Sequence, residues 1–357
     1  MGIRNLHTFL RKTIPLVYEE VSLTKYAYKR IAIDLSIYLC KYKAFYKERW
    51  LDAFLGLVTC LRENEIHFIF ILDSKSPPEK EEEKKNRILQ RQKLKTRIDD
   101  LESSLKLFLD KNQISEPIQK WIDNKSNMLN IVQVSNEIER LKSNFLDIRV
   151  EDFILVKQLF DILEIPYCYA VSEAEATCAH LCLNGQVDAV MTEDTDILAY
   201  GCPFNLHKIN IQTNTITLIE MKKLLTELQM TYPQFRDFCI MCGTDYNTNV
   251  PKIGPERAYK YLKDYKSIDH LSTFLDVSIL KHKTVRHLFS NDINFNISDD
   301  VYCGIPKYNE MNLFYFTNNC HFDLPRLFNA FNNPSVPLLF TDDDDNTTAN
   351  SLLGVST

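Results

Sequence analysis

The chain lacks the segments that direct a protein into or across a membrane. No run of 18 apolar residues occurs within its 357 residues, so we expect no membrane-spanning segment. The N-terminal stretch MGIRNLHTFL has no hydrophobic block of the secretory type. Leu6 occupies the position at which N-myristoylation requires Ser or Thr. These absences predict a nuclear or cytoplasmic protein.

A disulfide framework is also absent. The ten cysteines are scattered, without the spacings of a small disulfide-bonded domain, which indicates a reducing compartment. Cys239 and Cys242 form a single CxxC in an apolar stretch, with no second pair at zinc spacing. We therefore predict that both are buried core residues; a metal or redox site is the alternative.

The chain has no excess of positive charge either. Its formal net charge of −6 argues against a general nucleic-acid binder, but the charge is unevenly distributed. Residues 75–97 carry nine Lys or Arg against four Glu, whereas residues 342–345 are all Asp. A composition of 45% hydrophobic and 25% charged residues is typical of a globular protein. We expect a disordered tail from residue 342 onward.

Several apolar runs end in acidic residues. Residues 30–36 contain Asp34, residues 66–72 precede Asp73, and residues 187–191 precede Glu193, Asp194 and Asp196. Continuous apolar runs favour a parallel sheet with helices on both faces. The carboxyl ends of such strands form the ligand-binding edge of an open α/β sheet. Further strands are predicted at 166–170, 206–211 and 215–219.

The acidic motif at 193–196 predicts a bound cation. On an extended segment, Asp194 and Asp196 would leave the same face. Two carboxylates about 4 Å apart repel by roughly 4 kcal/mol at an effective dielectric constant of about 20. A solvated acidic turn explains this motif equally well when it is taken alone.

The helical segments include one long insertion. We predict one helix over 37–63, then two amphipathic helices of similar length around 98–108 and 131–145. A polar connection around Trp121 would join these two into an antiparallel hairpin that projects from the sheet. A coiled-coil arm for a protein partner is the alternative.

Two helix starts have both a structural and a functional interpretation. Ser172 and Glu175 fit a capping box, yet Glu173 and Glu175 could instead present carboxylates to a metal at the same helix start. In residues 250–257, Pro255 suits the first helical position and Gly254 permits close approach of the backbone. This second start is either a phosphate site or an ordinary helix N-terminus.

The order of the motifs carries more information than any one of them. The succession MGI, IAID, FILD, SEAEA, MTEDTD, GTDY and IGPERA resembles the flap endonuclease/XPG family of structure-specific nucleases, from Met1 to about Leu262. The long insertion resembles that of members carried by large DNA viruses. The resemblance implies a PIN-like α/β core over 1–270, with an inserted helical arch at 75–148 and a helix–two-turn–helix hairpin at 246–265. A C-terminal helical or irregular extension at 271–340 and a disordered tail at 341–357 would follow.

The resemblance also implies a site for two divalent ions, Mg²⁺ with Mn²⁺ as a substitute. Two such ions suit in-line hydrolysis of a phosphodiester, and Mg²⁺ prefers oxygen ligands. Asp34 would act through water, and Asp194 would be shared between the two sides of the site. The implied ligands are Asp34, Asp73, Glu173, Glu175, Asp194, Asp196 and Asp245.

Other residues are implied to contact DNA. Lys80 and Arg87, seven residues apart on the first arch helix, would contact the scissile phosphate. Lys84, Lys85 and Arg91 are alternatives to this pair, and a solvated charged helix is the non-functional interpretation. The remaining candidates are Tyr38 or Tyr42 to stack a base, Gly2 beside the active site, and, with a monovalent cation, Lys252, Ile253, Gly254 and Arg257 on duplex backbone.

The resemblance predicts a divalent-metal-dependent 5′ nuclease for branched DNA, such as flaps, nicks, gaps or junctions, in replication, repair or recombination. If the chain is viral, a cytoplasmic replication site is expected. A catalytically silent DNA-binding scaffold and a junction-resolving enzyme are the alternatives. A one-metal phosphatase or sugar-transfer enzyme would leave Asp34 and Asp73 unexplained. No peptide of the sliding-clamp-binding type occurs near the C-terminus, and nothing in the sequence indicates an oligomeric state.

Overall fold

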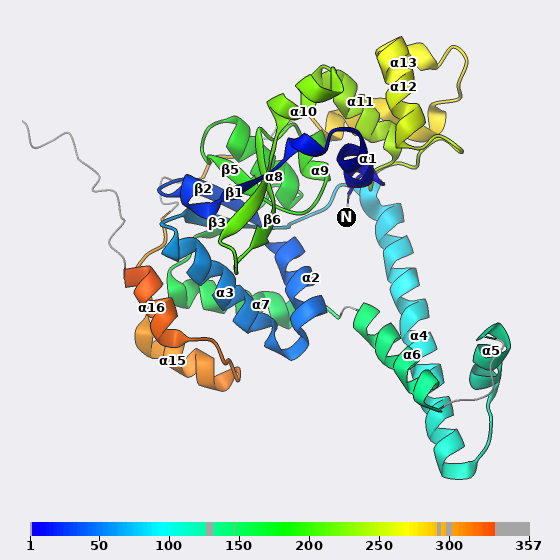
Figure 1. Cartoon of the computed structure of the whole chain (residues 1–357), viewed down its shortest axis with the longest axis vertical. Coiled ribbons are helices and arrows are strands. Elements are labelled where there is room, and N and C mark those ends of the chain that lie inside the picture. The colour runs from blue at the N-terminus through cyan, green and yellow to red at the C-terminus, as the bar shows by residue number, and fades with distance from the viewer. Residues whose placement is uncertain (1, 126–130, 146, 291–293, 298–301, 333–357) are drawn as a thin grey trace, which may run out of the picture.

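The computed structural model describes residues 2–125, 131–145, 147–290, 294–297 and 302–332. A seven-stranded sheet lies between two layers of helices. A helical arch made of α4, α5 and α6 extends away from this core (Figure 1). The predicted class, α/β with a mostly parallel sheet, is confirmed.

The sheet has the order β1-β7-β6-β5-β2-β3-β4. The five strands β2 to β6 run parallel to their neighbours among themselves, and β7 is antiparallel to both β6 and β1. Apolar side chains on both faces explain why the central strands are continuous hydrophobic runs. The strands are β1 (Tyr18–Ser22), β2 (Arg30–Asp34), β3 (His67–Leu72), β4 (Tyr167–Tyr169), β5 (Ala189–Met191), β6 (Phe204–Asn210) and β7 (Thr215–Glu220).

Helices cover both faces of the sheet, and alternate residues of β2 point to different layers: Ala32 packs in one, Ile31 and Ile33 in the other. The first layer contains α1 (Leu6–Thr13), α8 (Ala174–Leu183), α9 (Asp196–Ala199), α10 (Met221–Leu228), α11 (Tyr232–Cys242), α12 (Pro255–Tyr265), α13 (Ile268–Leu271) and α14 (His282–Leu288). The second contains α2 (Leu35–Tyr46), α3 (Trp50–Glu63), α7 (Val150–Leu163), α15 (Tyr308–Thr317) and α16 (Leu324–Asn332).

The single helix predicted over 37–63 is wrong in one respect. The chain forms α2 and α3, separated by a short 3₁₀ turn over Lys47–Arg49. Lys47 has φ 49, a backbone conformation that an α-helix cannot continue through. The apolar periodicity continues across this break because both helices pack against the same core, so the pattern alone did not reveal it.

The arch has its own small hydrophobic core. It consists of α4 (Glu81–Lys111), α5 (Glu116–Lys125) and α6 (Ile131–Asn144), which are unequal in length, contrary to the expectation of two similar helices. Trp121 does not belong to a polar connection: it lies in α5 and packs with Ile98 and Leu101 of α4 and Val134 of α6. The arch is therefore a three-helix unit.

The C-terminal part packs back onto the core. Met311 and Phe314 of α15 and Leu327 and Phe331 of α16 are buried among the residues of α3 and α7.

Cys239 and Cys242 are buried in α11, as predicted. No helix in the described part of the chain is long and apolar enough to cross a membrane. The acidic run and the predicted disordered tail lie outside the described residues.

Candidate active site

Strand pairing places three of the predicted acids at one edge of the sheet. Asp34 is the last residue of β2, and its neighbour in β3 is Ile71, so Asp73 follows two residues beyond that level. Ile33 pairs with Met191 of β5, which places Thr192 beside Asp34 and Asp194 just past the strand end. Parallel pairing therefore brings these side chains, distant in sequence, to the carboxyl edge, as the sequence predicted.

Hydrogen bonds fix the orientation of Asp34. Its carboxylate accepts from the backbone N–H of Ile37 at 3.4 Å, which caps α2, and from the Thr192 hydroxyl at 3.2 Å. The same hydroxyl accepts from the N–H of Asp194 at 3.1 Å. Thr192, which the sequence reasoning missed, therefore holds two strand ends together. Thr192 directly follows the apolar run at residues 187–191 in the motif MTEDTD, and this position was the available signal.

Asp73 determines the structure of the α8 start. Its Oδ1 accepts from the backbone N–H of Ala174 at 2.9 Å, and its Oδ2 accepts from the Ser36 hydroxyl at 2.5 Å. The capping box predicted from Ser172 and Glu175 is wrong, because Glu173 is the N-cap residue and makes no side-chain cap. Ser172 instead donates to the carbonyl of Lys75. Asp73, which is distant in sequence, thus caps α8 in place of Ser172.

The acidic motif after β5 is a turn and not an extended segment. Asp194 Oδ1 accepts from the backbone N–H of Asp196 at 3.0 Å, and Asp196 is the first residue of α9. Thr195 has helical dihedral angles. The expectation that the two aspartates share the face of a strand is therefore wrong, although both lie at the site. Burial leaves Asp196 Oδ1 without a hydrogen-bond partner among the described residues.

Lys80 joins two further acids of the set, Glu173 and Asp245. Its ammonium contacts Glu173 Oε1 at 2.5 Å and Asp245 Oδ2 at 3.1 Å, and Arg87 contacts Asp245 Oδ1 at 2.7 Å. Glu173 Oε2 also accepts a hydrogen bond from the hydroxyl of Tyr246. Tyr246 was missed as a site residue, although it lies in the GTDY motif that contains Asp245.

Burial and mutual repulsion disfavour the ionised forms of several acids. Burial, with Asp73 and Asp194 nearby, raises the pKa of Asp34 to about 8. The pKa of Glu175 is raised well above its usual value by burial and by Asp34, Asp194 and Asp73. Burial and then Asp194 and Asp245 raise the pKa of Asp196 in the same way. Burial is the largest cause of each of these pKa shifts, and the neighbouring carboxylates add to it by repulsion.

Nearby acids favour the ionised form of Lys80, whereas they disfavour the ionised forms of one another. Burial alone would lower the pKa of its ammonium, but Glu173, Asp245 and Glu175 together raise that pKa instead. The ammonium is therefore a counter-ion for one side of the acid cluster. All seven predicted acids thus interact within one region of the molecule.

The residues present suit hard divalent cations. The donors are carboxylate oxygens, which Mg²⁺ and Mn²⁺ prefer, and the unpartnered Asp196 Oδ1 needs a cation or a proton. Within the described ranges, no three acidic, His or Cys side chains already surround a common ion position. The Lys80 ammonium contacts two of the acids that would do so. The donor set fits, and binding would require these side chains to reorient.

Gly2 packs directly against the acidic turn. A Cβ atom there would lie 2.1 Å from Asp194 Oδ1 and 2.7 Å from Asp196 Oδ1, and Gly2 has φ +78. The next residue anchors the same turn, since the N–H of Ile3 donates to the Thr195 hydroxyl at 2.6 Å. The glycine is required for close approach and for its backbone conformation.

We expect Gly2→Ala to displace the N-terminus or the acidic turn. Because the added methyl overlaps Asp194 and Asp196, cleavage activity should fall by about 10²-fold if those acids act in catalysis. Steady-state cleavage of a labelled substrate measures the effect. Gly185→Ala is the control: it also has positive φ but nothing lies within 4 Å of its added Cβ. Equal losses in both variants would show that strain, not the site contact, is responsible.

The alternatives to Lys80 and Arg87 lie elsewhere on the surface of α4. Lys85 pairs with Glu81 at 3.1 Å, Arg91 pairs with Asp147, and Lys84 is exposed. Only Lys80 and Arg87 of these five contact the predicted acids.

The two tyrosines predicted to stack a base are buried. Tyr38 is 0% exposed and Tyr42 4% exposed, and both pack in the core layer with Phe54. Their rings face the interior because α2 turns that side toward α3, so this expectation is corrected. The exposed aromatic residues of α2 are Phe45 and Tyr46 at its C-terminal end. Their exposure is evident from the structure but not from the sequence.

The 250–257 turn has the predicted helix start. Gly254 is the N-cap of α12, Pro255 is its first residue, and there is open space beside Gly254. The Ile253 side chain is buried, so only its backbone is available to a ligand. Lys252 and Arg257 are exposed, and Arg257 donates to the Lys252 carbonyl at 2.8 Å. They line a cleft of about 410 Å³ together with Lys12.

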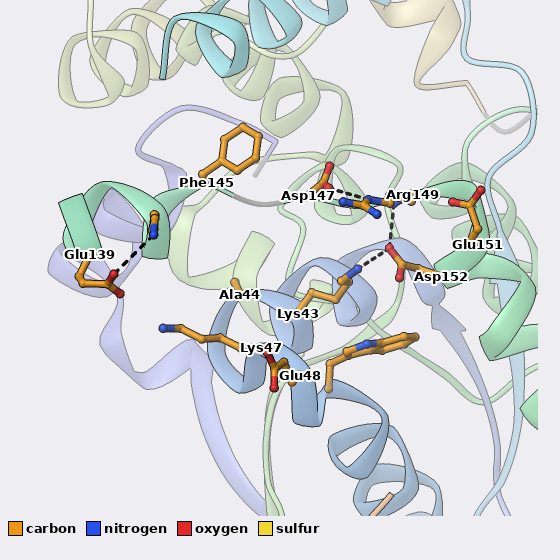
Figure 2. A pocket seen from close by; sticks show the side chains of 12 residues that line it. Lys43, Ala44, Lys47, Glu48, Glu139, Phe145, Asp147, Arg149, Glu151 and Asp152 are labelled. Atoms are coloured by element: carbon orange, nitrogen blue, oxygen red, sulfur yellow. Dashed lines mark hydrogen bonds and ion pairs between the residues drawn. The ribbon is translucent and has the colours of Figure 1, made fainter. Parts of the chain in front are cut away.

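A separate cleft of about 580 Å³ lies between the end of α2, the end of α6 and the start of α7 (Figure 2). Lys43 pairs with Asp152, and Arg149 pairs with Asp147 at 2.7 Å. The lining of this cleft carries five acidic side chains and four basic ones. None of the seven acids lines it, so this cleft is not part of the acid site.

Comparisons with known proteins place the chain among endonucleases. Residues 1–94 match the XPG N-terminal domain and residues 164–245 match the XPG I-region. The chain is 32% identical to "Probable RAD2-like endonuclease 076L" of Invertebrate iridescent virus 3, over 95% of this chain and 100% of that protein. It is 29% identical to flap endonuclease 1 of Cryptosporidium parvum, over 87% of this chain and 66% of that protein.

Solved structures share the fold. The catalytic core of Rad2 in complex with DNA substrate aligns with a TM-score of 0.59 at 17% identity, over 89% of this chain and 95% of that one. Flap endonuclease-1 from Methanococcus jannaschii aligns with a TM-score of 0.57 at 20% identity, over 88% and 94%.

A mostly parallel sheet, an acid cluster at its carboxyl edge and a basic arch beside that cluster define the class of structure-specific nucleases. The chain belongs to the flap endonuclease/XPG family. The expected likeness to viral members is confirmed by the virus relative.

Proposed function

We propose that the protein is a divalent-metal-dependent 5′ nuclease that hydrolyses phosphodiester bonds in branched DNA. The observation that carries this proposal is the convergence of seven carboxylates beside Lys80 and Arg87. Carboxylates alone would repel a phosphodiester, so a site of this composition requires cations to bind its substrate. The relatives named endonuclease and flap endonuclease support a nuclease, and the Rad2 catalytic core, which shares the fold and was solved in complex with DNA substrate, supports DNA as the substrate.

Two groups of acids would hold the metal ions. Asp73, Glu173, Glu175 and Asp194 would serve one side, and Asp194, Asp196 and Asp245 the other, with Asp34 acting through water. Bound Mg²⁺ or Mn²⁺ would supply Lewis acidity toward the phosphodiester and the attacking water. Asp34 is suited to an indirect role because it is buried and already accepts from Ile37 and Thr192.

Lys80 and Arg87 would position the scissile phosphate. Both extend from the start of the arch to Asp245, and their donors could transfer from carboxylate to phosphate oxygens. Charge-assisted hydrogen bonds to a phosphate that gains negative charge stabilise the transition state more than the ground state. The exchange would also release Glu173 and Asp245 for cation binding.

The turn at 250–257 would hold the duplex part of the substrate. Its backbone is accessible beside Gly254, and Lys252 and Arg257 add positive charge. The Ile253 carbonyl accepts from the Asn249 side chain at 2.8 Å, which orders the loop. A monovalent cation at this turn stays a prediction, as do the choice among flaps, nicks, gaps and junctions and an intracellular site of action in the nucleus or cytoplasm.

Cleavage of a labelled 5′-flap duplex tests the proposal. We expect hydrolysis near the junction in Mg²⁺ or Mn²⁺ and none in EDTA. A nicked duplex and a four-way junction, assayed in parallel, determine the preferred branch. Binding of the flap without cleavage in any divalent ion would instead favour the catalytically silent scaffold.

A further inference from the structure

Two buried tyrosines lie behind the acid site. Tyr200 directly follows α9, and Tyr246 directly follows Asp245. Each tyrosine is 3% exposed, and their hydroxyl oxygens are 3.0 Å apart. Tyr246 also donates to Glu173 Oε2. Tyr200, Tyr246 and Glu173 therefore form a hydrogen-bonded chain, here called the tyrosine relay, that ends at one of the predicted cation ligands.

The hydrogen bonds of the relay run in one direction. The Glu173 carboxylate, which also contacts the Lys80 ammonium, can only accept when it is ionised, so Tyr246 donates its single proton to it. Toward Tyr200 the Tyr246 oxygen can then only accept, and Tyr200 is the donor. A hydroxyl that accepts a hydrogen bond becomes a stronger donor itself. Tyr200 therefore strengthens the contact between Tyr246 and Glu173.

Burial keeps the first hydroxyl of the relay protonated. Burial, followed by the charge of Glu173, raises the pKa of Tyr200 well above its usual value. The Tyr200 hydroxyl therefore remains a donor at every pH at which the protein is folded and Glu173 is ionised.

Packing fixes the positions of both tyrosine rings. The Phe289 ring is fully buried, and its centroid lies 5.0 Å from that of Tyr200 and 5.5 Å from that of Tyr246, with interplanar angles of 80° and 71°. These are favourable edge-to-face contacts. The N–H of Tyr200 also donates to the carbonyl of Asp196 at 3.1 Å. The relay thus connects the acidic turn after β5 to Glu173 at the start of α8.

The two oxygens of Glu173 have different partners. Lys80 contacts Oε1 at 2.5 Å, whereas Tyr246 holds Oε2. In the proposed reaction the Lys80 ammonium transfers to a phosphate oxygen, which frees Oε1 for a cation. Tyr246 would then still hold Oε2 and preserve the orientation of the carboxylate. Hydrogen-bond partners that orient a metal ligand typically change metal affinity or activity by about 10–100-fold when they are removed.

We propose that Tyr200 is a positioning residue for the divalent-cation site. Through Tyr246 it orients the Glu173 carboxylate so that Oε1 is available to the cation. This inference rests on the proposed nuclease function and adds to it a residue that belongs to none of the sequence motifs. A purely structural tyrosine would contribute to stability and leave the affinity for the cation unchanged.

Tyr200→Phe tests the relay, because it removes one hydroxyl oxygen and keeps the ring against Phe289. Unfolding midpoints over a Mg²⁺ titration report cation binding without any need for cleavage. We expect the Mg²⁺ concentration for half of the stabilisation, and that for half-maximal single-turnover cleavage of a 5′-flap duplex, to rise about three- to tenfold. Tyr246→Phe, which removes the direct contact with Glu173, should raise both about 10–100-fold. Cleavage by Tyr200→Phe at saturating Mg²⁺ should stay within about twofold of wild type.

The double variant Tyr200→Phe/Tyr246→Phe examines whether Tyr200 acts through Tyr246. Once the Tyr246 hydroxyl is gone, loss of the Tyr200 hydroxyl should not increase the Mg²⁺ requirement any further. Increases that add, so that the double variant needs several-fold more Mg²⁺ than Tyr246→Phe, would contradict the relay.

Tyr232→Phe is the matched control. Its hydroxyl donates to the carbonyl of Ala199 at 2.7 Å, so this variant loses a hydroxyl hydrogen bond beside Tyr200 that does not lead to an acid. Its Mg²⁺ requirement should equal that of wild type. An unchanged requirement in Tyr200→Phe, or an equal increase in Tyr232→Phe, would overturn the proposal.

The two readouts separate the relay from the nuclease function. If Mg²⁺ stabilises the wild-type protein but neither Mg²⁺ nor Mn²⁺ supports cleavage, the nuclease function fails, and the shift in stabilisation still decides the relay. If wild type cleaves the flap and Tyr200→Phe needs no more Mg²⁺ than wild type, the relay fails and the nuclease function stands. If Mg²⁺ neither stabilises the wild-type protein nor supports cleavage, both are refuted.

Discussion

Asp194→Asn should abolish cleavage while the protein still binds DNA. The substitution keeps the size of the side chain, and the amide oxygen can still accept from the N–H of Asp196. It removes one negative charge from the acid that the proposed mechanism shares between both metal sides. Losing a group that stabilises charge in a transition state costs about 10²–10³-fold in rate, and a shared ligand should cost at least that much.

Single-turnover cleavage of a 5′-flap duplex over a range of Mg²⁺ concentrations measures this effect. Asp188→Asn is the matched control, because Asp188 lies just before β5, at the opposite end of the strand that leads to Asp194. There it accepts from the N–H of Arg30 at 2.8 Å and pairs with the side chains of Lys29 and Arg30, away from the seven acids. Wild-type rates in Asp194→Asn would remove this residue from the metal site.

Lys80→Met should impair both catalysis and the stability of the metal-free protein. The Lys80 side chain, which is 12% exposed, contacts Glu173 at 2.5 Å and shares Asp245 with Arg87, and the side chains of the two acids are 7% and 8% exposed. Removing one partner of a buried ion pair typically costs about 3 kcal/mol or more, because the remaining charge is left buried and unpaired. Cleavage should fall by about 10²-fold because the scissile phosphate loses a charged donor.

Thermal unfolding in EDTA and in Mg²⁺ separates these two effects. In EDTA the unfolding midpoint of Lys80→Met should lie several degrees below that of wild type, and Mg²⁺ should restore most of the difference by replacing the missing charge. Lys85→Met changes an exposed lysine in α4, the helix that Lys80 precedes; Lys85 pairs with Glu81 at 3.1 Å, and its substitution should leave both properties unaltered. A deficit that Mg²⁺ does not reduce would mean that the cation does not bind beside Glu173 and Asp245.

Local sequence was sufficient for six of the seven described strands; the exception is β1 (Tyr18–Ser22), where no strand was predicted. Apolar runs ending in Asp34, Asp73 and Asp194 located β2, β3 and β5 within a few residues, because a strand buried on both faces must be apolar throughout. Parallel pairing then made their convergence predictable. The Pro255 helix start was equally readable, since its chemistry depends on adjacent residues.

Long-range contacts decided what local patterns misread. The Ser172 capping box was locally plausible, but the Asp73 carboxylate occupies the α8 start from a distant strand. Tyr38 and Tyr42 looked available because helical spacing does not reveal which side of α2 faces α3. The same limitation concealed α5. Trp121 is a single aromatic residue in a mostly polar stretch, and its burial between α4 and α6 is evident only in the folded chain.

The sequence by itself determined which acids exist and which edge of the sheet they occupy, because each acid directly follows its apolar run and the carboxyl ends of parallel strands lie at the same edge. Only the tertiary structure decided how these acids are compensated. Lys80 reaches Glu173 and Asp245 from an inserted helix, Gly2 approaches Asp194 from the chain start, and Thr192 links Asp34 to Asp194. Such contacts depend on three-dimensional distance between charges, which sequence spacing does not encode.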